Sequence, residues 1–311
     1  MSNRLNIREG LHVLDCFEGI KKMGDESVDT VITSIPYYAV RDYGHPQQFG
    51  LESDPAEYIE KIVNLFNTEV YRVLSKTGCV FLNIGDVYGG DRSGHRPTNT
   101  RNHKGHVSRK MDTKEPWAKP KQLMQIPARI AIAMQQRGWI LRNELIWYKP
   151  NACPQSVSDR FSNKYEKVYF FVKSPKYIFN LQDIKIPCLT KGATKGHYSI
   201  GGANYKKYGQ RSYSGKEWVP GLNGKNPGDV FSVPTRAYKG PHPAVFPPSL
   251  IEPFVKASKE GGIILDPFVG TGTTWEVALQ YNRRFVGFEI NPDFADEAVK
   301  RTSLVQMKLS I

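Results

Sequence analysis

The feature that most constrains the fold of this chain is a glycine-rich turn between an apolar run and a helical pattern. Residues 262–265 are the apolar run, and the turn reads Asp-Pro-Phe-Val-Gly-Thr-Gly-Thr-Thr at positions 266–274. A strand that enters a helix through such a turn exposes backbone N–H groups and lets a ligand lie against the main chain. The pattern therefore predicts a ligand site at the carboxyl end of a strand in a parallel sheet.

A second apolar run, residues 28–32, also ends in polar residues, with Thr-Ser-Ile-Pro-Tyr-Tyr at positions 33–38. The carboxyl ends of parallel strands meet at one edge of a sheet, and ligands bind in the crevice there. We therefore expect residues 33–38 and 266–274 to form two halves of one site, although more than two hundred residues separate them.

The remaining patterns alternate between strand and helix. Residues 54–74 place apolar side chains at intervals of three and four, with Asp54 as a helix cap and Pro55 in the first turn. Such alternation predicts crossover connections and a parallel sheet covered by helices. Residues 139–148 and 167–172 are expected to form an antiparallel pair at the sheet edge. The other expected strands are 11–15, 79–84, 262–266 and 284–289, and the other expected helices are 17–23, 123–137, 248–258, 272–281 and 292–304.

Positive charge is concentrated in two segments. The net charge is +13, and residues 87–122 and 183–228 each contribute +6. The first segment has no periodicity and predicts a basic mobile loop. The second holds nine glycines and several aromatic residues, which predicts a small irregular insertion. Basic segments interleaved with aromatic side chains indicate a nucleic-acid partner.

Other classes of protein are disfavoured by what the chain lacks. It has no apolar run as long as a membrane span, its start has no secretory leader, and its four cysteines include no CxxC pair or zinc-ligand spacing. We therefore expect a cytoplasmic protein with reduced thiols, no membrane partner and no metal.

The chemistry of the glycine turn favours a nucleoside without phosphates. Gly270 and Gly272 remove side chains where a ligand lies against the backbone. Glu289, about twenty residues further on at the end of the next strand, suits hydrogen bonds from ribose hydroxyls, and Asp266 suits an amino group. The turn lacks the third glycine of a dinucleotide site and the Gly-Lys-Ser/Thr of a phosphate loop, so NAD and ATP fit less well.

The same turn resembles the cofactor motif Asp-Pro-Phe-x-Gly-Ser-Gly-Thr-Thr of S-adenosylmethionine-dependent DNA amino-methyltransferases, with Thr271 in place of serine. Residues 287–291 resemble the ribose-binding strand of that family, and residues 242–247 resemble its segment over the methionine end of the cofactor. The resemblance implies that S-adenosylmethionine is bound by Asp15, Phe246, Pro247, Asp266, Phe268, Gly270, Gly272, Thr273 and Glu289.

The string Ser34-Ile35-Pro36-Tyr37 resembles the active-site motif of that family, Asp/Asn/Ser-Pro-Pro-Tyr/Phe. An exocyclic amine is a poor nucleophile because its lone pair is delocalised into the base. A side-chain acceptor at the first position and the next backbone carbonyl can accept both N–H groups, which directs the lone pair toward the methyl group. The aromatic residue stacks on a base swung out of the duplex. Ile35 departs from the family proline, so we expect a less rigid turn that keeps its carbonyl.

The catalytic string precedes the cofactor string, which resembles the circularly permuted beta class of that family; residues 147–151, Arg160-Phe161 and Glu166 are further shared pieces. The class implies a Rossmann-like α/β methyltransferase domain over residues 1–182 and 229–311. Its sheet is expected to be mostly parallel and seven-stranded, with an antiparallel edge strand. Residues 183–228 are then the target-recognition region, with DNA contacts from Lys191, Lys195, Lys206, Lys207, Arg211 and Lys216.

The resemblance implies a sequence-specific enzyme that methylates an amine in double-stranded DNA. Serine at position 34 favours cytosine N4, and adenine N6 is the alternative. A C5-cytosine enzyme needs a cysteine nucleophile after a proline at a strand end, whereas Pro187-Cys188 lies in the glycine-rich segment. Methylation of RNA or protein, or DNA binding without catalysis, are further alternatives. A cognate restriction endonuclease and the oligomeric state, monomer or homodimer, stay open.

Overall fold

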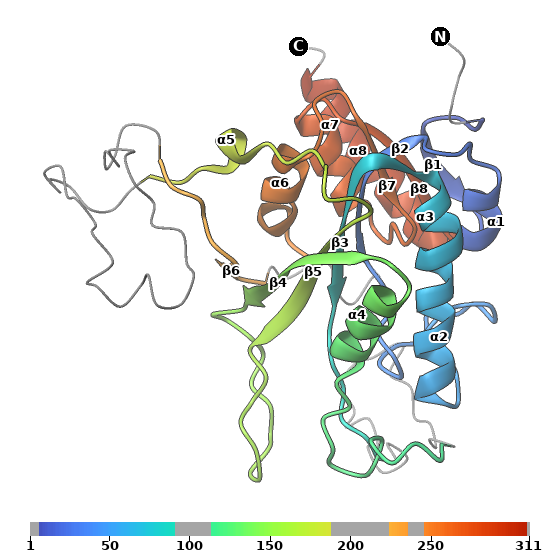
Figure 1. Cartoon of the computed structure of the whole chain (residues 1–311), viewed down its shortest axis with the longest axis vertical. Coiled ribbons are helices and arrows are strands. Elements are labelled where there is room, and N and C mark those ends of the chain that lie inside the picture. Colours follow the sequence, from blue (N-terminus) through green and yellow to red (C-terminus); the bar gives the residue numbers. More distant parts are fainter. Residues whose placement is uncertain (1–5, 91–112, 188–223, 236–245, 310–311) are drawn as a thin grey trace, which may run out of the picture. The chain divides into compact units, whose positions relative to one another are not determined.

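The computed structural model describes residues 6–90, 113–187, 224–235 and 246–309, with side chains described as far as residue 305. Its described strands form one eight-stranded sheet in the order β1-β8-β7-β2-β3-β5-β4-β6 (Figure 1). The strands are β1 (Gly10–Val13), β2 (Val28–Ser34), β3 (Leu74–Ile84), β4 (Ile140–Tyr148), β5 (Tyr165–Val172), β6 (Val230–Ser232), β7 (Ile263–Asp266) and β8 (Arg284–Glu289).

Helices cover both faces of the sheet. They are α1 (Cys16–Lys21), α2 (Pro55–Leu65), the π-helical η1 (Phe66–Val70), α3 (Tyr71–Val73), α4 (Ile126–Gln136), α5 (Leu181–Ile184), α6 (Pro248–Ala257), α7 (Thr273–Gln280) and α8 (Pro292–Leu309). Successive strand residues point to opposite faces. Val31 accordingly packs in one core with Ile62 of α2 and Ile130 of α4, and Ile32 packs in another with Phe254 of α6. The expected α/β fold with a helix-covered sheet is confirmed.

The sheet is mostly parallel, as expected, but its reversed strand is not at the edge. Among the described strands only β5 runs antiparallel, to β3 on one side and to β4 on the other. The expected pairing of residues 139–148 with 167–172 is therefore confirmed. The expected count of seven strands is wrong, because β6 adds a parallel edge strand beyond β4. Three residues are too few to show strand periodicity in a sequence.

The long helix expected over residues 54–74 forms as α2, η1 and α3 in succession. The Asp54 side chain accepts a hydrogen bond from the backbone N–H of Ala56 at 3.0 Å, and Pro55 occupies the first turn, as the capping pattern predicts. The helix ends at Val73, and β3 begins at once with Leu74, which pairs with Val28 of β2. This strand is therefore longer at its start than the expected 79–84.

The chain divides into two compact units, residues Leu181–Gly228 and the remainder. Within the smaller unit the described features are α5 and a bridge between Ile186 and Lys225. The six basic residues expected to contact DNA lie outside the described residues; they are Lys191, Lys195, Lys206, Lys207, Arg211 and Lys216. None of the described helices is both long and apolar enough to span a membrane.

Part of the basic segment 87–122 packs on the larger unit. The guanidinium of Arg129, on α4, lies 3.8 Å from the centre of the Trp117 ring, and Ala118 is buried. The Thr113 hydroxyl donates to Asp54 at 3.0 Å. Residues 91–112 of this segment lie outside the described residues.

Candidate active site

The two polar strand ends meet in the middle of the sheet. Strands β2 and β7 are parallel neighbours, with Val31 opposite Leu265. At their carboxyl ends the Thr33 hydroxyl donates to Asp266 Oδ1 at 2.6 Å. Both residues are almost fully buried, at 2% and 1% exposure. This hydrogen bond joins the catalytic string directly to the glycine turn, so the expectation that the two strings are neighbours is confirmed.

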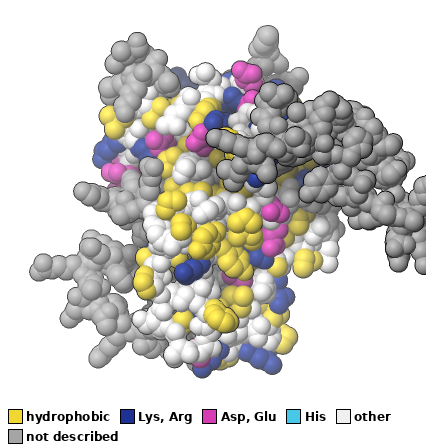
Figure 2. Space-filling model, turned by 90° about the vertical axis from the view of Figure 1, so that its left-hand side faces the viewer, with side chains coloured by type: hydrophobic (Ala, Val, Ile, Leu, Met, Phe, Trp, Pro, Cys, Tyr) yellow, Lys and Arg dark blue, Asp and Glu magenta, His cyan; other side chains and the backbone are white. Residues whose placement is uncertain are grey.

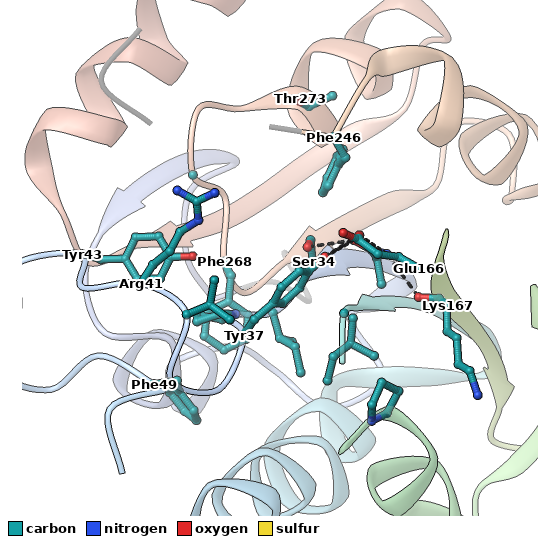
Figure 3. Close-up of a pocket in the computed structure, with 18 of the residues that line it drawn as sticks. Ser34, Tyr37, Arg41, Tyr43, Phe49, Glu166, Lys167, Phe246, Phe268 and Thr273 are labelled. Carbon is teal, nitrogen blue, oxygen red and sulfur yellow. Dashed lines mark hydrogen bonds between the residues drawn. The ribbon is translucent and has the colours of Figure 1, made fainter. Parts of the chain in front are cut away.

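A cavity of about 1460 Å³ lies between these strand ends. Figure 3 shows Phe246 pointing toward Ser34 across this space, with Phe268 beside Tyr37; Thr273 also lines the cavity. Of the candidate residues, those that line the cavity are Asp15, Ser34, Ile35, Pro36, Tyr37, Phe246, Phe268, Gly270, Thr273 and Glu289. Asp266, Gly272 and Pro247 are not among the residues that line the cavity.

The glycine turn is built from positive backbone angles. Gly270 has φ of 53° and Gly272 has φ of 81°, a region that side-chain-bearing residues rarely adopt. A Cβ on Gly272 would lie 2.8 Å from the Cβ of Ala298, so this glycine lets the turn pack on α8. Gly270 instead lines the cavity. The two glycines therefore serve different purposes, close packing and an open approach to the backbone.

Two buried carboxyl groups lie behind the turn. Glu289 accepts hydrogen bonds from the backbone N–H of Gly270 at 2.8 Å and of Asn291 at 2.9 Å. Burial nevertheless raises its pKa to about 7, because desolvation outweighs those hydrogen bonds. Burial likewise raises the pKa of Asp266 to about 6, although Thr33 and the Phe268 N–H donate to it. Both groups are thus poised to respond to a ligand that offers donors or positive charge.

The catalytic string is held by a polar network from β3 and β5. The Ser34 hydroxyl donates to Asn83 Oδ1 at 2.9 Å, and the Tyr37 hydroxyl donates to Glu166 Oε2 at 2.6 Å, with Asn83 Oδ1 3.1 Å from the same phenol oxygen. Burial, followed by the charge of Glu166, raises the pKa of Tyr37 well above its usual value. The phenol therefore stays protonated and keeps donating to the carboxylate.

An ion pair completes this network. Lys149 Nζ donates to Glu166 Oε1, and it lies 4.2 Å from the centre of the Trp147 ring. The side chains of Lys149 and Glu166 are 18% and 16% exposed, so the lysine offsets a largely buried charge. Sequence reasoning did not single out Asn83. Its one signal is a polar residue inside the apolar strand 79–84.

The turn after Ser34 has Ile35 where the family motif has its first proline, and other contacts hold the backbone in place. The Ile35 side chain is 2% exposed and packs in the core, and its N–H donates to the Asn83 carbonyl at 3.3 Å. The buried Tyr58 hydroxyl donates to the Pro36 carbonyl at 2.7 Å. These contacts restrain the backbone that a proline would otherwise restrain. Tyr38 is buried and donates to the Ser53 carbonyl, which gives it a structural position outside the cavity lining.

Aromatic rings form the wall near the glycine turn. The Phe49 and Phe268 rings meet edge to face at 5.2 Å, and Phe17 stacks behind Phe49 at 6.1 Å. Asp15 caps α1 by accepting from the N–H groups of Phe17 and Glu18, and it also lines the cavity. The site thus combines an apolar wall, two buried carboxyl groups and a hydroxyl–amide–phenol cluster.

Comparisons with known proteins agree with this geometry. A family model described as DNA methylase, of the N6/N4 type, matches residues 28–300. The Type II methyltransferase M.Cfr9I of Citrobacter freundii is 35% identical over 288 residues, which cover 92% of this chain and 85% of the relative. The Type II methyltransferase M.SmaI of Serratia marcescens is also 35% identical over 288 residues, with 92% and 88% covered.

Solved structures share the fold over nearly the whole chain. PvuII DNA methyltransferase, described as cytosine-N4-specific, has a TM-score of 0.63 at 17% identity, with 97% of this chain and 92% of that chain covered. The complex of M1.HpyAVI with SAM has a TM-score of 0.51 at 18% identity, with 94% and 98% covered.

Proposed function

This chain belongs to the N6/N4 family of DNA methylases, and we propose that it transfers a methyl group from S-adenosylmethionine to the exocyclic N4 amine of cytosine in duplex DNA. The observation that carries this proposal is the Ser34 hydroxyl, which lines the same cavity as Gly270 and Glu289. The N4 assignment is further supported by the serine itself and by the fold shared with a methyltransferase described as cytosine-N4-specific.

The residues around the glycine turn fit S-adenosylmethionine. The Glu289 carboxyl suits the ribose hydroxyls, since it lines the cavity next to the Gly270 backbone. Phe268 and Phe49 provide an apolar wall for the adenine, and Asp15 provides a polar group at the same end of the cavity. The buried Asp266 adds negative potential that favours a cationic ligand. Bound there, S-adenosylmethionine supplies an electrophilic methyl group.

The catalytic string prepares the amine as a nucleophile. Because Ser34 donates its own proton to Asn83, the lone pairs of its oxygen stay available to accept an N–H from the amine. The Ile35 carbonyl takes the second N–H, in a turn that Tyr58 restrains. These two acceptors direct the nitrogen lone pair and stabilise the positive charge that forms on it. The Tyr37 ring, held by Glu166, stacks on the extruded base.

The proposal also covers recognition of the target sequence, a partner endonuclease and the cellular compartment. We propose that residues 183–228 read the target sequence, with the six basic side chains named above on the DNA backbone. The relatives are named Type II methyltransferases, and we propose that this enzyme likewise protects DNA from a cognate endonuclease. The substrate and the free cysteines Cys16, Cys79 and Cys153 are consistent with action in the cytoplasm.

The proposal is tested by nucleoside analysis of DNA. Genomic DNA from bacteria that express the chain is digested to nucleosides and analysed by chromatography and mass spectrometry, with bacteria that express Ser34→Ala as the control. We expect N4-methyldeoxycytidine with the wild-type chain only. N6-methyldeoxyadenosine would move the assignment to adenine, whereas 5-methyldeoxycytidine or unmodified DNA would overturn it.

A further inference from the structure

The segment between β4 and β5, residues 149–164, extends from the sheet as a long hairpin (light green in Figure 1). We call it the β4–β5 hairpin. At its base the Lys149 N–H donates to the Lys164 carbonyl at 2.8 Å. Several of its residues line the cavity, among them Asn151, Gln155 and Asn163. The hairpin is therefore one wall of the proposed active site and also projects beyond it.

An aromatic side chain is fully exposed on this hairpin. Phe161 is 96% exposed, more than any other large hydrophobic residue in the described part of the chain. Its backbone is held in place, because Arg160 Nη1 donates to the Phe161 carbonyl at 2.9 Å and to Gln155 Oε1 at 3.0 Å. The Arg160 guanidinium also lies 4.1 Å from the centre of the Tyr88 ring. The ring of Phe161 is thus presented to solvent from a fixed base.

Two further exposed aromatic side chains flank the base of the β4–β5 hairpin. Tyr148 and Tyr165 face each other across β4 and β5 and are 38% and 53% exposed. Figure 2 shows hydrophobic side chains gathered on one face of the larger unit, with Asp and Glu side chains beside them and Lys and Arg side chains among and below them. The β4–β5 hairpin has three basic residues and one acid, and residues 113–122 have the same balance. An ion pair of 2.7 Å between Lys121 and Asp159 joins the two segments.

Aromatic rings within positive charge are suited to nucleic acid, since the charge attracts phosphates and the rings stack on bases. A base that leaves the duplex for the cavity leaves a gap in the stack, and side chains inserted between base steps occur in other DNA-binding proteins. On the basis of the proposed function, we propose that Phe161 enters the duplex and fills the space vacated by the target base. The ring would then stabilise the extruded state that the cavity receives.

The size of the rate loss expected for Phe161→Ala follows from the stacking energy that the ring contributes. Removal of one base–aromatic stack costs roughly 5- to 150-fold in an equilibrium constant. We expect Phe161→Ala to slow single-turnover methylation of a paired duplex by a factor in this range. With an abasic site opposite the target, the target base has no pairing partner and its extrusion is easier, so the variant should approach the wild-type rate. Phe161→Trp should retain activity on both duplexes.

The experiment uses the full-length chain and a duplex that contains a site methylated in cells. Leu304→Ala, which truncates a 62% exposed side chain on α8, is the matched control and should leave both rates unchanged. Equal losses on the two duplexes, or no loss on the paired one, would overturn the role of Phe161.

A second readout separates this inference from the proposed function. A duplex with 2-aminopurine in place of the target base reports extrusion by a rise in fluorescence, because the extruded base is no longer stacked, whether or not methyl transfer occurs. We expect a smaller fluorescence change with Phe161→Ala than with the wild-type chain, at DNA concentrations that saturate both. Equal changes would refute insertion, whereas absence of methylation by the wild-type chain on every DNA would refute only the proposed function.

Discussion

The hydrogen bond between Thr33 and Asp266 gives the most quantitative test of how the two halves of the site are joined. Thr33→Val keeps the shape of the buried side chain and removes only the hydroxyl that donates to Asp266 Oδ1 at 2.6 Å. With a pKa of about 6, Asp266 is ionised at pH 8 and mostly protonated at pH 5. A hydrogen bond to an ionised group is worth about 1.5–3 kcal/mol and one to a neutral group about 0.5–1.5 kcal/mol.

We therefore expect Thr33→Val to lower the free energy of unfolding by about 2 kcal/mol at pH 8 and by about 1 kcal/mol at pH 5. The penalty is larger at pH 8 because the Thr33 hydroxyl stabilises the ionised form of Asp266 more than the protonated form. For the same reason, loss of the hydroxyl raises the pKa of Asp266 further. Urea titrations of the protein without ligand at the two pH values measure both numbers. Thr33→Ser retains the hydroxyl and is the matched control.

Two results would refute this reasoning. If Thr33→Val were as stable as the wild-type chain at pH 8, the hydroxyl would not support the carboxylate. If the penalty were the same at pH 5 and pH 8, Asp266 would not change its charge between them.

Two further predictions concern the cofactor and the DNA. Burial raises the pKa of Glu289 from 4.5 to about 7, so the folded chain holds a proton that the unfolded chain releases. The tighter proton binding of the folded chain adds about 3 kcal/mol to the free energy of unfolding. This added stability is complete below pH 4.5 and disappears as the pH rises through about 7. Glu289→Gln should remove most of that pH dependence in urea titrations and weaken S-adenosylmethionine in calorimetry; an unchanged pH dependence would contradict the assignment. Replacing Lys206 and Lys207 with alanine should lower the slope of log affinity for DNA against log salt by about 2, and an unchanged slope would exclude them from the contact surface.

The parts of the site that the sequence predicts are those with local patterns at strand ends. Ser34 and Gly270 each lie within a few residues of the end of an apolar run, and in a parallel sheet this is enough to bring them to one edge. The capped helix that begins at Asp54 is likewise a local pattern, and it was located correctly. The turn at Ile35 was expected to be less rigid, but Tyr58, twenty-two residues from Pro36, restrains it by a contact that no local pattern reveals.

Asn83, which sequence reasoning missed, and the contact of Glu166 with Tyr37 both depend on distant pairings. Asn83 approaches Ser34 because β2 and β3 are neighbours, and Glu166 approaches Tyr37 only because the reversed strand β5 lies beside β3. A polar residue in an apolar strand has no defined partner until the strand order is known. The edge strand β6 was missed because its three residues are too short for a periodic signal.

The central claim is that Ser34 and the glycine turn are two halves of one methyl-transfer site. Single-turnover methylation and calorimetric titration with S-adenosylmethionine, both on Ser34→Ala, test it most directly. We expect methylation to slow by about 100-fold or more while the affinity for S-adenosylmethionine stays unchanged, because the serine contacts the target amine. A full methylation rate, or an equal loss of rate and affinity, would contradict the account.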